Sequence, residues 1–340
     1  MKKLKVIFYI LSILLIYSCE DIFIKPADSD QNMEDFIAVW YRANEVYPFF
    51  ELKEIDWNSI YTAYHPRVDA ARGDEFYFVL NDLLSELKDG HVSYTTDGGG
   101  PVTPYMPQRF LKDKDAYSPF VVRKYFESEL LVTKSETTEY GITPDNIGYI
   151  YLGSFTNDYL GKEFPAVIKY LKNTKGLIID LRNNPGGNHI SVAAVVSRFI
   201  SEPLELPIFY TLGERYEFPT IMPQGPFTYT NSIVVLINGS SASAGELAPE
   251  IFKQLPNVTV IGDTTAGALG SSWNFSTATN SLFRLPSGKT VYIPTGYWEG
   301  YDGEHLEWNG VSPDIRIEQT ENDINNGIDK QLKFAIDMLK

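Results

Sequence analysis

Two loops, each following a run of apolar residues, hold residue types that could attack a carbonyl group and stabilise the resulting charge. Residues 180–188 contain a Pro-Gly-Gly turn, which would expose backbone N–H groups of the kind that an oxyanion hole needs. Residues 238–246 place small residues around Ser243, so that a substrate backbone could come close. A serine at a helix N-terminus also gains from the helix dipole when its oxygen becomes anionic. Each loop alone has a structural explanation: a tight turn for the first, and a Ser-x-x-Glu capping box for the second.

Composition narrows the possible functions. The chain has 340 residues and a formal net charge of −15, so a basic face for nucleic acid is not expected. One cysteine, Cys19, excludes an intramolecular disulfide and a cysteine-based zinc site. The acidic residues around His305 could hold a cation, but the spacing His-Glu-x-x-His does not occur. We therefore expect no metal and no cofactor.

The N-terminus is typical of an export signal. A basic start at residues 1–5 precedes a mostly apolar run at 6–16 that is shorter than the roughly 20 residues of a membrane span. The run ends at Cys19 in a sequence that resembles a bacterial lipobox, although a simple signal peptide with an incidental cysteine is the alternative. We expect a signal peptide at 1–18 and a lipid on Cys19. The lipid would anchor the chain to the bacterial cell envelope, at the periplasmic or surface face of the outer membrane.

The remaining chain divides into four expected segments. Residues 19–33 are predicted to be a tether, 34–95 a helical domain, 96–145 a mixed connection and 146–340 an α/β core. In the core, apolar strand candidates alternate with helix-length segments, which predicts crossover connections and a largely parallel sheet. In such sheets the active site lies beyond the carboxyl ends of the strands, where both loops described above are expected. Further strands are predicted at 120–125 and 130–133.

Four segments in a fixed order resemble one peptidase family. Lys88–His91, Asn183–Gly187, Ser243–Glu246 and Glu307–Asp314 are similar to segments of the C-terminal-processing (tail-specific) serine peptidases and of the catalytic core of tricorn protease. The resemblance runs from about residue 34 to 318. It implies a crotonase/ClpP-like α/β core preceded by a small helical domain, and a serine peptidase that needs no cofactor.

The resemblance also assigns roles. Ser243 matches the nucleophile, and the N–H groups of Ala244 and of Gly186 or Gly187 match the oxyanion hole. The Ser/Lys branch of the family takes its base from a lysine, but Ala268 stands at that position here. The tricorn-like branch uses a histidine, which His91 matches, and Glu307 matches its distant glutamate. Gly90 replaces the serine that links the two in tricorn, so Glu307 would orient His91 directly or through water.

Two alternatives stay open. His305 would share a strand face with Glu307 and is the second candidate base, whereas His189 and His65 are expected to be structural. We expect a lipoprotein serine peptidase that cleaves extended polypeptides through a Ser243 acyl-enzyme, its substrate paired along a strand edge. An inserted PDZ domain is not expected, because residues 95–145 are too few. The other function is an inactive relative that binds peptides or hydrophobic ligands, as retinoid-binding modules of this fold do.

Overall fold

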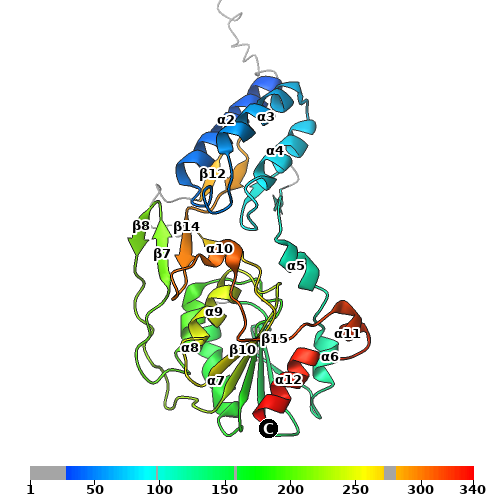
Figure 1. Cartoon of the computed structure of the whole chain (residues 1–340), viewed down its shortest axis with the longest axis vertical. Helices are drawn as coiled ribbons and strands as arrows, with labels where there is room; N and C mark the ends of the chain where they lie inside the picture. The colour runs from blue at the N-terminus through cyan, green and yellow to red at the C-terminus, as the bar shows by residue number, and fades with distance from the viewer. Residues whose placement is uncertain (1–27, 97–98, 157–158, 272–280) are drawn as a thin grey trace, which may run out of the picture.

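The computed structural model describes residues 28–340 except 97–98, 157–158 and 272–280. The predicted signal peptide and Cys19 lie outside the described residues. Among the residues described, no helix combines the length and the apolarity needed to cross a bilayer. The molecule is elongated, with a helical unit at one end and the α/β core at the other (Figure 1).

The helical unit contains α2 (Asp28–Val46), α3 (Trp57–Ala70) and α4 (Glu75–Ser85). Helix α2 begins inside the segment predicted to be a tether. The apolar faces of these helices, which include Phe36, Val39, Leu80 and Leu83, form the buried core of this unit. Burial of these faces, rather than local propensity, provides most of the stability of such short helices.

A small antiparallel sheet completes the helical unit. Its order is β12–β13–β1–β2, with bounds β1 (Ser93–Thr95), β2 (Pro101–Val102), β12 (Leu282–Arg284) and β13 (Thr290–Tyr292). Leu285, Val291 and Ile293 pack in the same apolar cluster as α2–α4. A segment assigned by sequence order to the core therefore packs with the N-terminal helices.

The core is a seven-stranded sheet in the order β15–β10–β9–β6–β5–β4–β3. The strands are β3 (Leu131–Val132), β4 (Thr138–Ile142), β5 (Gly148–Leu152), β6 (Leu177–Asp180), β9 (Ile233–Ile237), β10 (Val258–Gly262) and β15 (Ile315–Arg316). All neighbouring pairs from β5 to β15 are parallel, and β3 and β4 are antiparallel. The predicted α/β class with a parallel-rich sheet behind an N-terminal helical region is confirmed.

Helices cover both faces of this sheet (Figure 1). Helices α7 (Leu160–Leu171), α8 (His189–Val196) and α9 (Ala244–Phe252) pack on one face, and α12 (Lys330–Leu339) packs on the other. Successive residues of β9 alternate between the two clusters, as Val234 and Val235 show. Burial on both faces explains why the sequence of this strand is an unbroken apolar run.

The other elements lie at the edges of the core. A third sheet has the order β11–β14–β7–β8, with β7 (Ile208–Thr211), β8 (Glu214–Tyr216), β11 (Gly270–Ser271) and β14 (Gly296–Glu299). Short helices are α5 (Gln108–Asp113), α6 (Pro119–Arg123), α10 (Leu306–Asn309) and α11 (Glu321–Asn325). The strand predicted at 120–125 is wrong, because Pro119 opens a short helix there, a position that suits its fixed φ.

Candidate active site

Ser243 lies on a strained turn between β9 and α9. Its φ of 55° and ψ of −127° belong to a region that non-glycine residues rarely occupy. Its N–H donates to the carbonyl oxygen of Ala268 at 2.8 Å and to Oε2 of Glu246 at 3.1 Å. Such strain persists only where surrounding contacts fix the backbone, and it clusters at functional sites.

Glu246 is the group that fixes this turn. Its buried carboxylate accepts hydrogen bonds from Thr265 Oγ1 at 2.6 Å, Gly267 N at 2.7 Å and Ala268 N at 2.9 Å, besides that from Ser243 N. Burial raises the pKa of Glu246 to about 7, and these donors oppose the rise. Ser243 and Glu246 hold the N-cap and N3 positions of a capping box. The capping interpretation and a catalytic role for Ser243 are therefore compatible.

The Pro-Gly-Gly loop, which follows β6, packs directly against the serine. A Cβ on Gly186, whose φ is +98°, would lie 2.5 Å from Ser243 Cβ and 2.7 Å from Ala244 N. The N–H of Gly186 donates to Oδ1 of Asn184 at 2.8 Å. Among the described residues, we find no acceptor for the N–H groups of Gly187 and Ala244. The N–H groups of Gly187 and Ala244 are therefore the two candidates, among those predicted for the oxyanion hole, that could still donate to an oxyanion.

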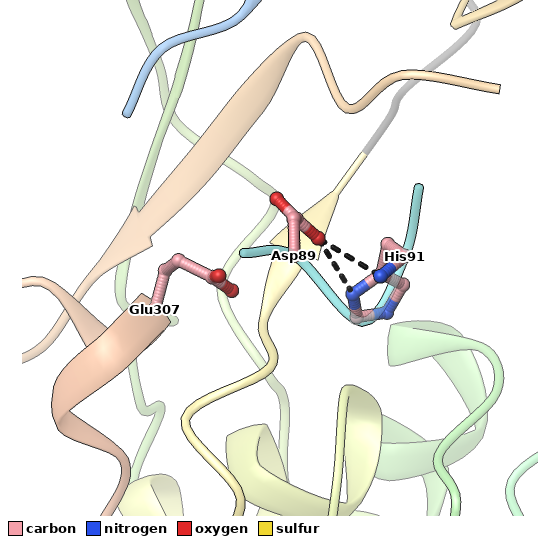
Figure 2. A group of neighbouring side chains, drawn as sticks. All are labelled: Asp89, His91 and Glu307. Carbon is pink, nitrogen blue, oxygen red and sulfur yellow. Dashed lines mark hydrogen bonds and ion pairs between the residues drawn. The ribbon is translucent and has the colours of Figure 1, made fainter. Parts of the chain in front are cut away.

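His91 follows α4 and lies beside Asp89 (Figure 2). Oδ1 of the fully buried Asp89 accepts the His91 backbone N–H at 2.8 Å and lies 4.0 Å from the ring Nδ1. The His91 side chain is 23% exposed, and its Nδ1 is buried without a hydrogen-bond partner among the described residues. Burial lowers the pKa of His91. The negative charge of Asp89 opposes this decrease, and the positive charge of Lys53 adds to it. The ring is therefore neutral at pH 7, as a general base must be.

Glu307 does not bond to His91. A carboxylate oxygen of Glu307 and a ring nitrogen of His91 lie within 4.8 Å of each other, with Asp89 between the two residues in Figure 2. Oε2 of Glu307 accepts the N–H groups of Leu269 and Gly270, both at 2.7 Å. Oε1 accepts Nζ of Lys53 at 2.6 Å. Burial and the charge of Asp89 raise the pKa of Glu307, whereas Lys53 lowers it.

Lys53 is a site residue that the sequence analysis missed. Its fully buried Nζ also donates to Tyr47 OH at 2.8 Å, to the Lys88 carbonyl at 3.0 Å and to Asp89 Oδ2 at 3.4 Å. No local motif could reveal it, because Lys53 and Glu307 are 254 residues apart in sequence. Asp89 could have been found from the sequence, because it belongs to the Asp-Gly-His segment from which His91 was chosen.

Asp89, His91 and Glu307 are the group of metal-ligand side chains found among the described residues. The ammonium of Lys53 contacts both carboxylates, so the chain itself supplies the positive charge that a bound ion would bring. A divalent ion there would face that ammonium as a like charge, which disfavours binding. The residues therefore fit an internal ion-pair network better than a metal centre.

The other histidines lie in structural contacts. His305 precedes α10 rather than lying on a strand with Glu307, so the predicted shared strand face is wrong. Its ring packs 4.4 Å from that of Tyr297. His189 opens α8 and packs 4.7 Å from the ring of Phe218, where burial lowers its pKa to about 4. His65 lies in α3 against Phe36 and Tyr61.

The described side chains of Ser243 and His91 are not joined by a hydrogen bond in this structure. A base must come within about 2.6–3.2 Å of the hydroxyl oxygen, although such bonds often tighten only in the substrate complex. The geometry thus brings a strained serine and two N–H groups together at the carboxyl ends of β6 and β9. Gly90, next to the neutral His91, lies close to Ala268, whose carbonyl oxygen accepts the Ser243 N–H. These are the parts required for acyl transfer.

Comparisons with known proteins find similarity to peptidases. Residues 28–86 match the model of the tricorn protease C1 domain. Carboxy-terminal processing protease CtpA of Bacillus subtilis is 28% identical over 186 residues, which are 54% of this chain and 37% of the relative. Tricorn protease of Thermoplasma acidophilum is 29% identical over 199 residues, covering 57% of this chain and 16% of the relative. The chain thus spans less than half the length of these curated relatives.

A solved structure covers more of the chain. A protein of Parabacteroides merdae, named as a candidate peptidase, has a TM-score of 0.78 and 25% identity, covering 91% of this chain and 96% of that one. Residues 146–317, just over half of the chain, match the model of peptidase family S41. The resemblance to C-terminal-processing peptidases is confirmed, and the chain belongs to peptidase family S41.

Proposed function

We propose that this chain is a serine peptidase that hydrolyses polypeptides through an acyl-enzyme on Ser243. The observation that carries the proposal is the contact between the strained Ser243 turn and the Gly186 loop. This contact supports an oxyanion hole, because the N–H groups of Gly187 and Ala244 belong to the two segments that touch there. Preorganised donors of this kind supply a large part of the rate enhancement in acyl transfer, about 10²–10³ for one donor.

The proposed reaction has two steps. In the first, His91 takes the proton of Ser243 Oγ, the oxygen bonds to the peptide carbonyl carbon, and the N–H groups of Gly187 and Ala244 hold the oxyanion. The imidazolium then protonates the leaving amine as the C–N bond breaks. In the second step, His91 takes a proton from water as the water oxygen attacks the ester carbon. The imidazolium then returns this proton to Ser243 Oγ as the ester C–O bond breaks, which releases the acid and the free serine.

The buried network has a positioning role in this mechanism. Asp89 faces Nδ1 of His91, which leaves Nε2 for the Ser243 proton and stabilises the imidazolium as it forms. Lys53 holds Asp89 and Glu307 in one ion-pair cluster. Glu307 is therefore proposed to act on the histidine through Lys53 and Asp89, rather than by bonding to it.

Labelling with a fluorophosphonate tests the mechanism on the purified full chain. We expect covalent labelling that Ser243→Ala abolishes and that His91→Ala slows by about 10²–10⁴-fold. The matched control is His305→Ala, which should label like the wild type. A folded wild type that stays unlabelled would refute the peptidase and favour the ligand-binding relative. Labelling that needs His305 rather than His91 would overturn the choice of base.

We also propose that Cys19 carries a lipid that anchors the chain to the bacterial cell envelope. The anchored peptidase would act on polypeptides there. The support is the basic and apolar N-terminal segment that ends at this cysteine. Growth of an expressing bacterium with an alkyne fatty acid should label the chain. Cys19→Ser should lose the label and Ser243→Ala should keep it. A wild type without label would overturn the anchor.

A further inference from the structure

A cavity of about 250 Å³ lies beside the proposed catalytic residues. One wall is Lys88, the residue before Asp89. Ala266 and Gly267 also line the cavity, next to Ala268, whose carbonyl oxygen accepts the Ser243 N–H. Trp308, the residue after Glu307, forms a third side. The cavity lining therefore belongs to the same segments that hold Ser243, Asp89 and Glu307.

We infer that this cavity is a substrate subsite that binds a carboxylate of the peptide, an inference that rests on the proposed peptidase function. Its polar lining residues are Lys88, Tyr105, Gln108 and Arg109, and no acidic residue lines it. Lysine and arginine are donors only, and tyrosine and glutamine can donate. The matching ligand is therefore an acceptor with a negative charge.

Lys88 is the group available to a ligand. It is exposed, and no ion pair of its ammonium is found among the described residues. Arg109 instead donates to the carbonyl oxygens of Thr265 at 2.9 Å and Asn309 at 2.7 Å, and also to that of Trp308. Arg109 thus holds the lining segments together and contributes a positive charge. The exposed ammonium of Lys88 is the group that can contact a bound carboxylate. Burial raises the pKa of Tyr105, so its hydroxyl remains a donor at neutral pH.

The charges behind the wall do not cancel this preference. Asp89 and Glu307 are buried, and Lys53 pairs with both. Glu246, which accepts the N–H of the lining residue Gly267, is also buried behind the wall, and its carboxylate accepts four hydrogen bonds. The three carboxylates are thus each held by buried donors of the protein, whereas the cationic Lys88 and Arg109 line the cavity itself. A cationic lining attracts anions locally.

Three residues around the cavity have a positive φ, and the backbone is strained at the two that are not glycine. Lys88 has a φ of 49°, Trp308 of 72° and Gly267 of 71°. A Cβ on Gly267 would lie 2.6 Å from the Trp308 carbonyl oxygen, so the two walls touch there. Non-glycine residues with such φ values are maintained against a cost of about 1–3 kcal/mol each, most often at ligand and active sites.

The size of the cavity limits its occupant. It is smaller than the roughly 300–1,000 Å³ of a pocket for a drug-sized molecule, so one side chain or one chain end fits. The carboxylate could belong to an Asp or Glu side chain or to the C-terminus of the peptide. Both present the same planar acceptor group, and the peptides chosen for the test separate them.

The test uses short fluorescent alanine-rich peptides with one Glu moved through the sequence, their Gln counterparts, and free-acid and amide forms of each. Hydrolysis is measured as kcat/KM with the full chain, and binding with its Ser243→Ala variant. We expect one acidic form to be preferred roughly 3- to 30-fold over its neutral counterpart, as for a charge-assisted hydrogen bond at a partly exposed site. Added salt should reduce this preference.

Lys88→Gln should bring the ratio of acidic to neutral peptide close to one, and Lys88→Glu should invert it. Each ratio is taken within one variant, so a general loss of activity cancels. Lys172→Gln, an exposed lysine after α7, is the control and should keep the wild-type ratio. A ratio that survives Lys88→Glu, in hydrolysis or in binding, would overturn the subsite. Failure of the peptidase itself would appear separately, as a wild type that the fluorophosphonate does not label.

Discussion

Asp89 tunes both the position and the protonation of His91. Burial lowers the pKa of the imidazole from its ordinary 6.5, and the negative charge of Asp89 opposes that change. A general base acts in its neutral form, so activity is lost as the pH falls through the His91 pKa. We therefore expect the acid limb of log kcat/KM in the wild type to lie below pH 6.5.

Asp89→Asn should move this acid limb to still lower pH, because the charge that raises the His91 pKa is removed. It should also reduce kcat/KM by about 10–100-fold, as loss of an orienting partner does. The pH profile is the decisive measurement, since a purely structural defect lowers activity without moving the limb. Asp82→Asn, a half-exposed carboxylate on α4, is the matched control. An unmoved limb in Asp89→Asn would contradict the role of Asp89.

Single residues show where sequence reasoning stops. Ser243 and His91 could be proposed as site residues from short motifs, because chemistry and turn geometry constrain their immediate neighbours. The sequence could not show whether the N–H of Gly186 or that of Gly187 is the better candidate for the oxyanion hole. It depends on where one N–H points, and the Asn184 side chain takes the N–H of Gly186. The proposed link from Glu307 to His91 also could not be predicted from the sequence, since it depends on the Lys53–Glu307 ion pair and no motif marks Lys53.

At the scale of elements, Glu246 connects the start of α9 to the segment behind the serine. Glu246→Gln replaces an acceptor of four hydrogen bonds by a group with one oxygen and an NH₂ that faces donors. Each donor left unpaired costs about 1–3 kcal/mol. We expect a loss of roughly 2–4 kcal/mol in the free energy of unfolding, and at least ~10-fold slower fluorophosphonate labelling as Ser243 moves.

Glu250→Gln tests whether this effect belongs to the turn or to any carboxylate of α9. Glu250 is also buried on that helix, but its carboxylate accepts the N–H of Tyr301, away from the serine. Denaturant unfolding and labelling rates of the two variants should therefore diverge, with labelling preserved in Glu250→Gln. Equal labelling rates in both variants would show that Glu246 does not hold Ser243 in place.

Elements with long apolar runs were predictable, and short polar ones were not. Strands β6 and β9 are buried on both faces, so their composition alone indicates them. The segment at 120–125 contains β-favouring residues, but Pro119 and the burial of Val121 and Val122 favour helix α6. Residues 306–309 form α10 instead of a strand, and Trp308 there has a positive φ that tertiary contacts impose.

At the scale of the molecule, the site lies where two units meet. The helical unit and the segment just after α4 contribute Lys53, Asp89 and His91, whereas the core contributes Ser243 and Glu307. Strands β12 and β13 return to pair beside β1, which ties the units together a second time. Sequence order suggested successive domains, because such a return is set by pairing between distant strands.

The Lys53–Glu307 pair should therefore couple stability and catalysis across the two units. Lys53→Met leaves two buried carboxylates without their cation, and we expect about 3–5 kcal/mol of destabilisation by denaturant unfolding. Arg67→Met breaks an exposed pair with Asp82 and should cost about 0–1 kcal/mol. Adding Glu307→Gln to Lys53→Met removes one of the uncompensated charges. That double variant should regain part of the stability without regaining activity, because Asp89 still lacks its lysine. If Lys53→Met were as stable and as active as Arg67→Met, the ion pair would not be what joins the helical unit to the catalytic core.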